Sequence, residues 1–286
     1  MKLLSTIIIC FVMLFFCGCS HKNNFTEAEF EATVEKAHKE KDPELILSYL
    51  NNTSSIPEIY KANAYVQLGL ISEEMHKDQK AILYFKKAIA TTNSEVSYQP
   101  ALIRGVAFYE LAKMYLERKE FDKAKVAYEQ LLLNHKRYPA LKLNSLKVYS
   151  ELASIGQELK DYKYQYEMLH KVLEFQKKTN NTPPSEIMSA YIFLSDCCNK
   201  LGNHKKSVYF GKLAINIYNE KHVENTYLLA LAYLHIAPSL YTAGDKEQAI
   251  KYAHKAFSIL KETSGIDSMY TKNATVLIKK WQPKGE

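Results

Sequence analysis

The chain contains few glycines and prolines, the residues that most favour turns. Its 286 residues include only 9 glycines and 8 prolines. An all-β sandwich or barrel needs a turn signal about every 8–12 residues, so this scarcity argues against such a fold. Hydrophobic residues make up 47% of the chain, which is enough for a continuous core. The composition therefore leaves helices as the main expected element.

Cysteine is also scarce. Cys10 and Cys17 lie in the N-terminal hydrophobic segment, and Cys197 and Cys198 are adjacent inside an expected helix. Adjacent α-carbons are about 3.8 Å apart, which is closer than ordinary disulfide geometry allows. We therefore interpret the pair as small core residues rather than as a redox pair.

The motifs of common enzymes are missing from the sequence. Its nine histidines are scattered, with no His-Glu-x-x-His motif and no His/Cys cluster at metal-ligand spacing. There is also no glycine-rich phosphate loop and no nucleophile elbow. The sequence thus predicts a protein that is not an enzyme and that needs no cofactor or metal.

The formal net charge is +7, but the basic residues are not gathered into one patch. They are spread over expected helix faces, as at Lys86–Lys87, Lys119–Lys125 and Lys205–Lys206. Dispersed lysines of this kind usually form solvated helix faces. We therefore expect no nucleic-acid partner.

One long hydrophobic run stands at the N-terminus. Lys2 is followed by Leu3–Phe16, an apolar segment interrupted only by Ser5 and Thr6. It is too short to span a membrane comfortably, which takes about 20 residues, but it suits the core of a secretory signal. Residues 1–18 are therefore predicted to be a signal peptide.

The end of this run, Phe16-Cys17-Gly18-Cys19, resembles the lipobox of bacterial lipoproteins, although that family prefers Leu where Phe16 stands. The resemblance implies an acylated Cys19 and a polar tether over residues 19–24. It also implies a place in the bacterial cell envelope, on the outer membrane if the cell is Gram-negative, facing the periplasm or the exterior. An ordinary cleaved signal or an uncleaved anchor is the alternative.

The rest of the chain is rich in self-similarity. Five segments share a bulky residue, a Leu or Ile three positions later, a small residue next, a loop, and a second helix with small residues. The equivalent sites in the second helices follow one another at steps of 43, 41, 42 and 42 residues: Ala81, Ala124, Gln165, Ser207 and Ala249. A fixed period of this size predicts a solenoid of stacked helical hairpins.

The repeat period predicts that the chain forms one elongated domain. Residues 25–56 are predicted to form a capping helical hairpin, and residues 57–262 to form the five repeats. The hairpins are expected at 57–91, 98–135, 139–178, 184–220 and 224–262. Residues 263–286 are expected to provide a closing helix and a tail, because the last repeat of a solenoid needs a cover for its apolar face.

The repeats resemble the tetratricopeptide family. Its pattern is carried in the first two copies by Tyr65, Leu68, Gly69, Ala81, Phe85 and Ala88, and by Phe108, Leu111, Ala112, Tyr115, Phe121, Ala124 and Tyr128. The third copy is degenerate, with Gln165, Leu169 and Val172 at the small and aromatic sites. The family's common repeat is about 34 residues, so this chain is similar to a lengthened variant. The resemblance implies an all-α, right-handed superhelical solenoid of antiparallel helix hairpins.

In this family the first helix of each hairpin lines the concave face. When these positions are carried over to this chain, the resemblance implies a binding surface with three residues from each of the second to fifth repeats. In that order they are Tyr109, Lys113 and Leu116; Ser150, Ser154 and Gln157; Ile192, Asp196 and Asn199; and Leu234, Pro238 and Tyr241. The set suits a peptide or protein segment, and it lacks the Lys and Asn constellation with which some members hold a C-terminal carboxylate. Packing between helices is the alternative role for each residue. Pro238 also interrupts an expected helix and predicts a kink.

The leading hypothesis is a non-catalytic scaffold that binds another protein or an extended peptide and is held to a membrane by a lipid anchor. The first alternative is a receptor or sensor module that captures a peptide or nutrient and signals through a separate membrane partner. A second alternative, an enzyme accessory or hydrolase, requires a catalytic constellation that the sequence does not contain. The sequence does not indicate an oligomeric state.

Overall fold

The fold was analysed in a computed structural model that describes residues 23–92, 97–140, 143–179 and 181–281. The predicted signal peptide and Cys19 lie outside the described residues. Where the sequence suggested one elongated domain, the chain divides into two compact units, residues 1–142 and residues 143–286. Each unit is described by itself.

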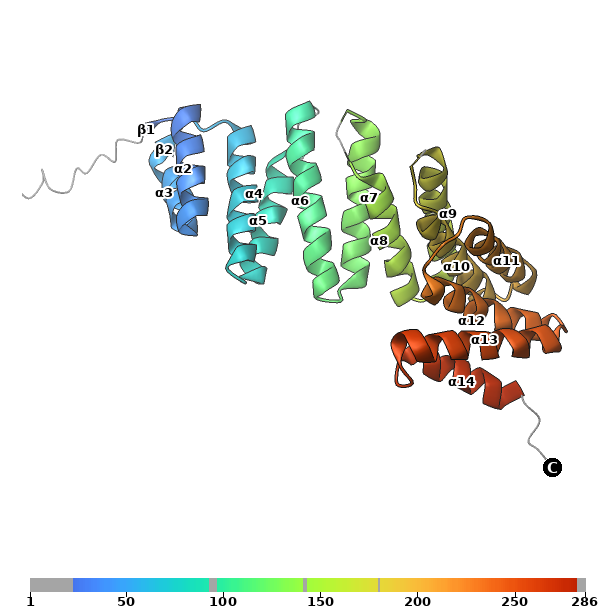
Figure 1. Ribbon diagram of the computed structural model, residues 1–286. Helices are drawn as coiled ribbons and strands as arrows, with labels where there is room; N and C mark the ends of the chain where they lie inside the picture. Colours follow the sequence, from blue (N-terminus) through green and yellow to red (C-terminus); the bar gives the residue numbers. More distant parts are fainter. Residues whose placement is uncertain (1–22, 93–96, 141–142, 180, 282–286) are drawn as a thin grey trace, which may run out of the picture. The chain divides into compact units, whose positions relative to one another are not determined.

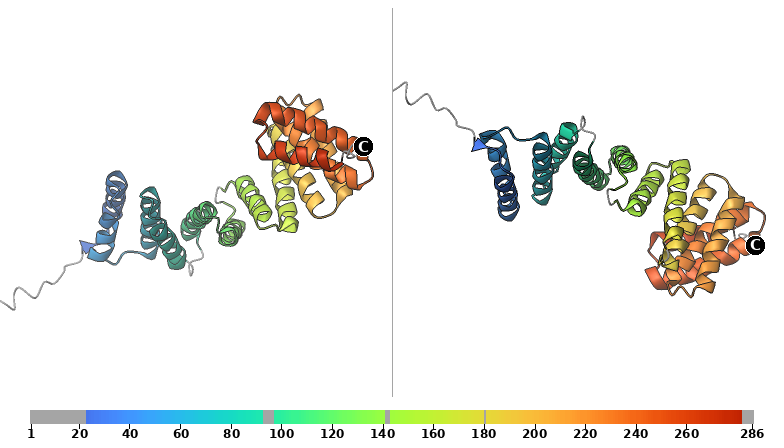
Figure 2. Two further views of the ribbon diagram at one scale, coloured as in Figure 1. Left: turned by 90° about the horizontal axis from the view of Figure 1, so that it is seen from below. Right: turned by 90° about the horizontal axis from the view of Figure 1, so that it is seen from above.

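Both units are built from helices that pack in consecutive pairs (Figures 1 and 2). The first unit contains β1 (Asn23–Asn24), α2 (Glu27–Glu40), α3 (Pro43–Asn52), β2 (Thr53–Ser54), α4 (Glu58–Glu74), α5 (Asp78–Thr92), α6 (Tyr98–Glu117) and α7 (Phe121–Arg137). The second unit contains α8 (Ser145–Glu158), α9 (Tyr162–Lys178), α10 (Pro184–Lys200), α11 (His204–Glu220), α12 (Thr226–Thr242), α13 (Lys246–Ser264) and α14 (Met269–Trp281). The predicted all-α fold of helix hairpins is confirmed.

The turn inside each hairpin has the same conformation in all five repeats. One residue per turn has a positive φ, between 55° and 97°, and these residues are His76, Lys119, Lys160, Gly202 and Gly244. They follow one another at the period of the sequence repeat. Only the last two turns use glycine, which adopts this conformation without the steric cost that a Cβ brings.

Short polar side chains begin most of the helices in the second unit. The side chains of Asp161, Asn203 and Asp245 each accept a hydrogen bond from the backbone N–H three residues later, at 3.0, 3.2 and 3.2 Å. Such caps satisfy donors that have no partner inside the helix. The polar residues that close each turn therefore also start the next helix.

Small residues allow the two helices of a hairpin to approach closely. Ala81, Ala124, Ser207 and Ala249 are fully buried. In the first hairpin the approach is so close that a Cβ on Gly69 would lie 2.5 Å from the ring of Phe85. Periodic small residues thus set the spacing inside each pair, as the repeat pattern requires.

The first pair of helices, α2 and α3, packs its apolar residues against α4. Phe30 of α2 and Ile46 of α3 share a buried cluster with Leu68 and Ile71. The last two residues of the expected tether, Asn23 and Asn24, form a short parallel bridge to β2. This end of the described chain is therefore attached to the first unit.

The last helix, α14, packs on α13 and α12. Its Trp281 is 8% exposed and stacks on Tyr241 of α12, with ring centroids 4.6 Å apart and planes 8° apart. The helix thus covers the apolar side of the final pair. In the part of the chain that the structure describes, none of the helices combines the length and the hydrophobicity that crossing a membrane requires.

Candidate functional site

A pocket of about 320 Å³ lies between α8 and α10. Helix α9 packs against both of these helices, and its residues also line the pocket. All the residues around it belong to the second unit. The pocket is lined by Leu146, Ser150, Ala153, Ser154 and Gln157 of α8, by Gln165, Leu169, Val172 and Gln176 of α9, and by Glu186, Ser189, Ala190 and Phe193 of α10. Helices α8 and α10 are the first helices of neighbouring hairpins, to which the sequence assigned the binding surface.

Small side chains on both walls leave room for the pocket. The hydroxyls of Ser150, Ser154 and Ser189 each donate to the carbonyl oxygen four residues earlier, at 2.9, 3.2 and 2.8 Å. These bonds fold the hydroxyls back onto their own helices. The serines therefore act mainly as small residues that keep the walls apart, and three of the sequence-assigned residues, Ser150, Ser154 and Gln157, lie at the pocket.

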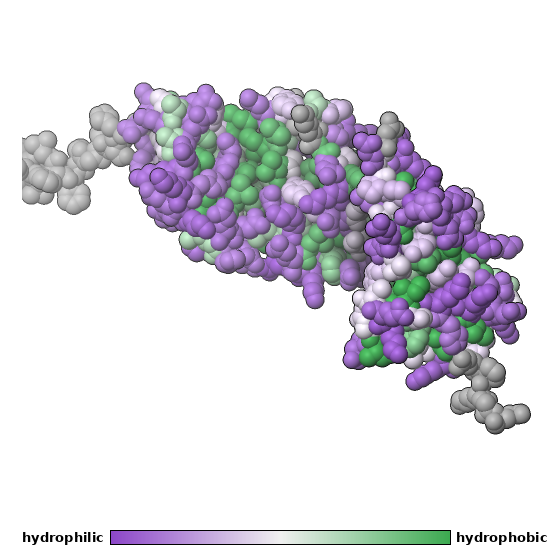
Figure 3. All heavy atoms as spheres, viewed as in Figure 1, coloured by the Kyte–Doolittle hydropathy of each residue, from purple (hydrophilic) through white to green (hydrophobic). Residues whose placement is uncertain are grey.

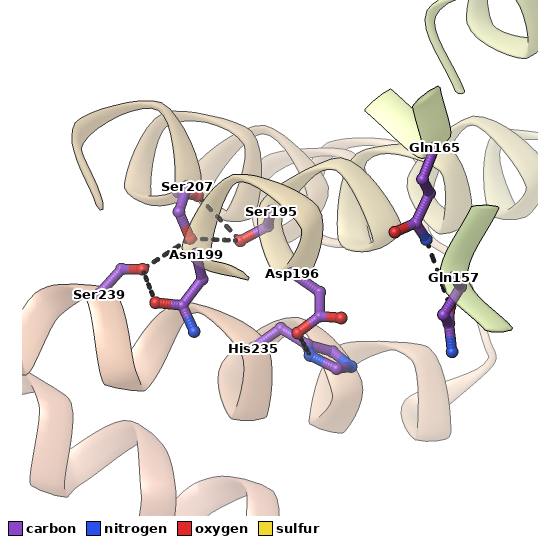
Figure 4. Close-up of polar contacts among 8 residues, drawn as sticks. All are labelled: Gln157, Gln165, Ser195, Asp196, Asn199, Ser207, His235 and Ser239. Carbon is purple, nitrogen blue, oxygen red and sulfur yellow. Dashed lines mark hydrogen bonds and ion pairs between the residues drawn. The ribbon is translucent and has the colours of Figure 1, made fainter. Parts of the chain in front are cut away.

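Two glutamines of α9 place amide groups at the buried base of the pocket. Gln165 is 2% exposed and Gln176 is 6% exposed. Gln165 Nε2 donates to Gln157 Oε1 at 3.2 Å (Figure 4). The Oε1 atoms of Gln165 and Gln176 have no hydrogen-bond partner among the described residues. Because an unpaired buried acceptor costs about 1–3 kcal/mol, a ligand that donates to these oxygens would be favoured.

A glycine on α8 explains how the larger side chain of Gln165 fits where other repeats carry Ala or Ser. A Cβ on Gly156 would lie 2.9 Å from the backbone nitrogen of Gln165 and 3.0 Å from its Cα. The equivalent positions in the neighbouring repeats carry Tyr115 and Cys198. The third repeat therefore departs from the common pattern at two positions that touch each other, and together they bring α9 close to α8.

The pocket combines apolar walls with one charge. Leu169 and Val172 form part of its buried surface, and Phe193, which is 40% exposed, lines it from α10. Glu186 is the one charged residue among those that line the pocket, and it is exposed in the first turn of α10. The site thus offers apolar surface, amide oxygens and a carboxylate.

The residues assigned from the fourth repeat face α12 instead of the pocket (Figure 4). Asp196 Oδ1 lies 3.0 Å from His235 Nδ1, and Asn199 Oδ1 accepts a hydrogen bond from Ser239 Oγ at 2.9 Å. Burial acts to raise the pKa of Asp196, but the hydrogen bond and charge of His235 outweigh it, so this pKa is lowered. Ile192 is 1% exposed. The next hairpin therefore occupies this surface.

The residues assigned from the fifth repeat also contact other helices. Leu234 is 5% exposed and belongs to the same core cluster as Ile192. Close packing of neighbouring hairpins buries both side chains, so neither is exposed on the surface to which the sequence assigned it. The ring of Tyr241 stacks on the ring of Trp281. Helix α12 continues through Pro238, whose missing N–H leaves the carbonyl of Leu234 without its usual helical donor.

A buried cluster of hydroxyls links α10, α11 and α12 (Figure 4). Ser195 Oγ donates to the carbonyl oxygen of Ser207 at 2.9 Å, and the Oγ atoms of Ser207 and Ser239 are 2.8 Å apart. All three serines are fully buried. With no exposure to solvent, these hydroxyls serve to hold the helices together.

In the first unit, the assigned residues Tyr109, Lys113 and Leu116 are half-buried on α6. Lys113 Nζ lies 2.6 Å from Glu110 Oε2 and 3.4 Å from Glu73 Oε1, and so links α6 to α4. Burial acts to lower the pKa of Lys113, but the two carboxylates outweigh it and raise this pKa overall. The charge of Lys113 is thus compensated within the unit.

A second groove, of about 380 Å³, lies among α2, α4 and α6 of the first unit. Its apolar surface includes Leu102 and Val106, which are 46% and 38% exposed. Figure 3 shows hydrophobic residues gathered over α4 and α6. Glu27 and Glu31 of α2 supply its charged groups, and none of its lining residues is a lysine or an arginine.

The adjacent thiols of Cys197 and Cys198 are free and buried. Burial raises the pKa of Cys197 to about 12 and that of Cys198 to about 11, so both stay protonated at neutral pH. Their interpretation as core residues is confirmed. Among the residues that the structure describes, no group of three or more His, Cys, Asp or Glu side chains is arranged to hold a metal ion.

The two buried glutamines of the pocket were not predicted as site residues by the sequence analysis. Gln165 was noted only as a departure from the small site of the repeat, and Gln176 was not singled out. The available signal was a polar residue at a periodic apolar position, since Leu169, Val172 and Gln176 follow one another at helical spacing on α9.

Comparison with known proteins supports the repeat fold. The family model for the tetratricopeptide repeat matches residues 62–93, and no curated protein matches the chain. The structure is similar to that of YrrB, a TPR protein described as having an unusual peptide-binding site, with a TM-score of 0.54 and 14% identity over 85% of this chain and 97% of that one.

Two further solved structures share the architecture. BtubC from P. vanneervenii has a TM-score of 0.55 at 17% identity, covering 83% of this chain and 91% of that one. The apo form of RapI has a TM-score of 0.58 at 8% identity, covering 89% and 69%. At these levels of identity the likeness shows the fold, an all-α helical repeat of the tetratricopeptide kind.

Proposed function

We propose that this protein is a non-catalytic scaffold that binds a segment of another protein, or an extended peptide, in the pocket between α8 and α10. The observation that carries the proposal is the pair of buried, unpaired oxygens of Gln165 and Gln176 in a pocket open to solvent. Native proteins rarely leave such groups without a partner. A bound segment would supply that partner.

The fold is suited to this role. The first helices of neighbouring hairpins present their side chains along one face, and peptide binding is a role stated for the similar structure of YrrB. The pocket of about 320 Å³ is large enough for a side chain with part of its backbone, and its mixed lining is typical of ligand sites.

We further propose that the protein is a lipoprotein of the bacterial cell envelope, with its anchor at Cys19. The support is the sequence Phe16-Cys17-Gly18-Cys19 behind a hydrophobic run. Two or more acyl chains at one residue would anchor the protein stably, whereas a single chain binds only marginally. Fractionation of cells that express the wild type and Cys19→Ala tests this. The wild type should sediment with membranes and the variant should not, and equal membrane association would contradict the proposal.

Binding can be tested with a displayed library of random short peptides. Peptides selected on the full mature chain would be synthesised, and their affinities measured by calorimetry for the wild type and for Ser150→Trp. The exposed Ser150 lines the pocket, so an indole there should fill it and weaken binding by about tenfold or more. Ser258→Trp, at an exposed position on α13, is the matched control.

The two tryptophan variants separate a pocket effect from a general one. Circular dichroism should show that both retain the helical content of the wild type, because both positions are exposed. Loss of binding in Ser150→Trp alone would support the proposal. Equal affinity of the selected peptides for both variants would place their binding elsewhere and overturn it.

A further inference from the structure

The groove of the first unit follows one face of α4. Helix α4 packs against α2 and against α6, and residues of all three helices line the groove. Along α4 the lining residues extend from Ile59 to Leu70, which corresponds to a groove about 16 Å long. The groove shares no residue with the pocket between α8 and α10, and all of it lies within the first unit. It is therefore a separate site.

The wall that α6 contributes is apolar and exposed. Tyr98, Leu102 and Val106 follow one another at intervals of four residues, so they lie on one side of α6, and they are 38–48% exposed. The last two of them line the groove. Among the described residues, no other helix carries as many exposed large hydrophobic side chains (Figure 3). A stripe of this kind marks a surface that a partner covers.

The amide group of Gln67, on the α4 side of the groove, is already engaged. Gln67 Nε2 donates to Asn63 Oδ1 at 2.9 Å, and Gln67 Oε1 lies 2.8 Å from His38 Nε2. An extended peptide would bring backbone N–H and C=O groups that need partners along its length. A helix pairs these groups internally and presents only its side chains to a groove. The groove therefore fits the apolar face of a helix better than an extended strand.

The wall that α2 contributes is acidic. Glu27 and Glu31 are exposed and one helical turn apart, and none of the residues that line the groove is a lysine or an arginine. Phe30, between them, packs on the ring of Tyr60 of α4, with centroids 5.4 Å apart. A hydrogen bond with Glu27 is the main cause that raises the pKa of Tyr60. The acidic wall thus lies beside the first turn of α4, in a chain whose formal net charge is +7.

We propose that the groove along α4 is the docking site of an amphipathic helix of a partner protein, with a lysine or arginine beside its apolar face. Apolar residues of that helix at positions i, i+4, i+7 and i+11 span about 16 Å and enter the groove over Leu102 and Val106. Its basic residue lies at the end of the groove that Glu27 and Glu31 flank. An anionic membrane surface or an acidic helix would instead bring like charge to these carboxylates. This site is additional to peptide binding between α8 and α10 and does not depend on it.

A library of amphipathic helical peptides tests the proposal. Each peptide has about 18 residues on an alanine-rich frame, with Leu, Ile, Phe or Met at i, i+4, i+7 and i+11, and with Lys, Glu or Ser at the positions that flank this stripe. Selection on the full mature chain should enrich lysine over glutamate at a flanking position. Equal recovery of lysine and glutamate would overturn the part assigned to the acidic wall.

A proline tests the helical form of the ligand. Placed at the centre of a selected peptide, on its polar face, proline removes a helical hydrogen bond and should weaken binding by about tenfold or more, as measured by calorimetry. Serine at the same position is the control and should leave the affinity nearly unchanged. Equal affinity of the proline and serine peptides would show that the ligand binds in an extended form and would overturn the proposal.

Two leucines of the first unit provide matched variants of the protein. Leu102 lines the groove, whereas Leu83 lies on α5 outside it, and the two are 46% and 50% exposed. Leu102→Lys should weaken binding by about tenfold or more, because it removes apolar contact and sets a like charge against the basic peptide. Leu83→Lys should bind as the wild type does, and circular dichroism should show both variants folded. Selected peptides that bind Leu102→Lys and Leu83→Lys equally would overturn the docking site.

A charge reversal tests the acidic wall. The wild type should prefer a selected lysine peptide to its glutamate counterpart by about two- to fivefold at low salt, because the carboxylates are exposed. Glu31→Lys should reverse this preference. Glu29→Lys makes the same change at an exposed residue on the opposite side of α2 and should keep the preference. A preference that is unchanged in Glu31→Lys would overturn the contact with the basic residue.

Other occupants are outcomes of the same series. If sedimentation shows that the mature chain is a dimer and that Leu102→Lys dissociates it, a second copy covers the groove and the partner helix is overturned. Ser150→Trp, which lies in the other unit, should bind the helical peptides as the wild type does. Loss of their binding in Ser150→Trp would place them in the pocket between α8 and α10, which would overturn this inference and support the proposed function.

Discussion

Replacing Gly156 with alanine should loosen the contact between α8 and α9. The added Cβ would lie 2.9 Å from the nitrogen, 3.0 Å from the Cα and 3.1 Å from the Cβ of Gln165. Two of these atoms are backbone and cannot rotate away, so the helices must separate. Overpacking of this kind costs about 1–3 kcal/mol, whereas alanine gains about 0.5–1 kcal/mol over glycine inside a helix. We expect a net loss of about 1 kcal/mol in the free energy of unfolding.

Gly105 of α6 provides a control with the opposite expected sign. A Cβ there would meet Asn134 Nδ2 at 3.4 Å and Leu131 Cδ1 at 3.7 Å, which are ordinary contacts. The higher helix propensity of alanine than of glycine should then determine the change in stability. Gly105→Ala should raise the free energy of unfolding by about 0.5–1 kcal/mol.

Urea unfolding measures both changes. Circular dichroism follows the helices of the whole chain, and the fluorescence of Trp281, the only tryptophan, follows the second unit, which contains Gly156. The midpoint of the fluorescence transition should fall in Gly156→Ala. If this variant is as stable as the wild type, or more stable, the close approach of α9 to Gly156 is not a constraint and the reasoning fails.

Three further predictions follow from single side chains. Lys160 has a φ of 56°, so Lys160→Gly should remove left-handed strain and raise the unfolding free energy by about 1 kcal/mol; an unchanged urea midpoint would contradict this. The buried thiols of Cys197 and Cys198 have raised pKa values and should react with a thiol reagent at neutral pH only after unfolding, so rapid labelling of the folded protein would count against their burial. The pKa of Asp196 is lowered by its bond to His235, so its stabilising contribution is present above the ordinary Asp pKa, about 3.9, and is lost as the pH falls through the lowered value. Asp196→Asn should cost about 1 kcal/mol at neutral pH and remove this acid-induced loss from urea unfolding measured over a pH series.

The repeat pattern predicted the local structure well because it depends on neighbours in the sequence. The positive-φ residues of the turns, from His76 to Gly244, recur at the period read from Ala81 and its equivalents. Small residues mark the sites where two helices of a hairpin meet, and this contact is short in sequence. The helices of the hairpins follow from these signals alone.

The assignment of a binding surface by position was less successful. Ser150 and Ile192 occupy equivalent positions, yet Ser150 lines a pocket and Ile192 is 1% exposed. The difference comes from the next hairpin, because α12 packs directly on α10 and its His235 engages Asp196. A mapping that treats all repeats alike cannot show how closely each neighbour packs.

The sequence by itself determined the all-α repeat, its period and the helix hairpins, because periodic apolar and small residues dictate which faces are buried. Only the tertiary structure decided where the repeat leaves space. Gln165 is a departure from the pattern in the sequence. It becomes part of a site through Gly156 on α8, Gln176 about three turns further along α9, and the small residues of α8 and α10. These groups come from three helices. An oxygen can be recognised as lacking a hydrogen-bond partner only when all of its neighbours in space are known.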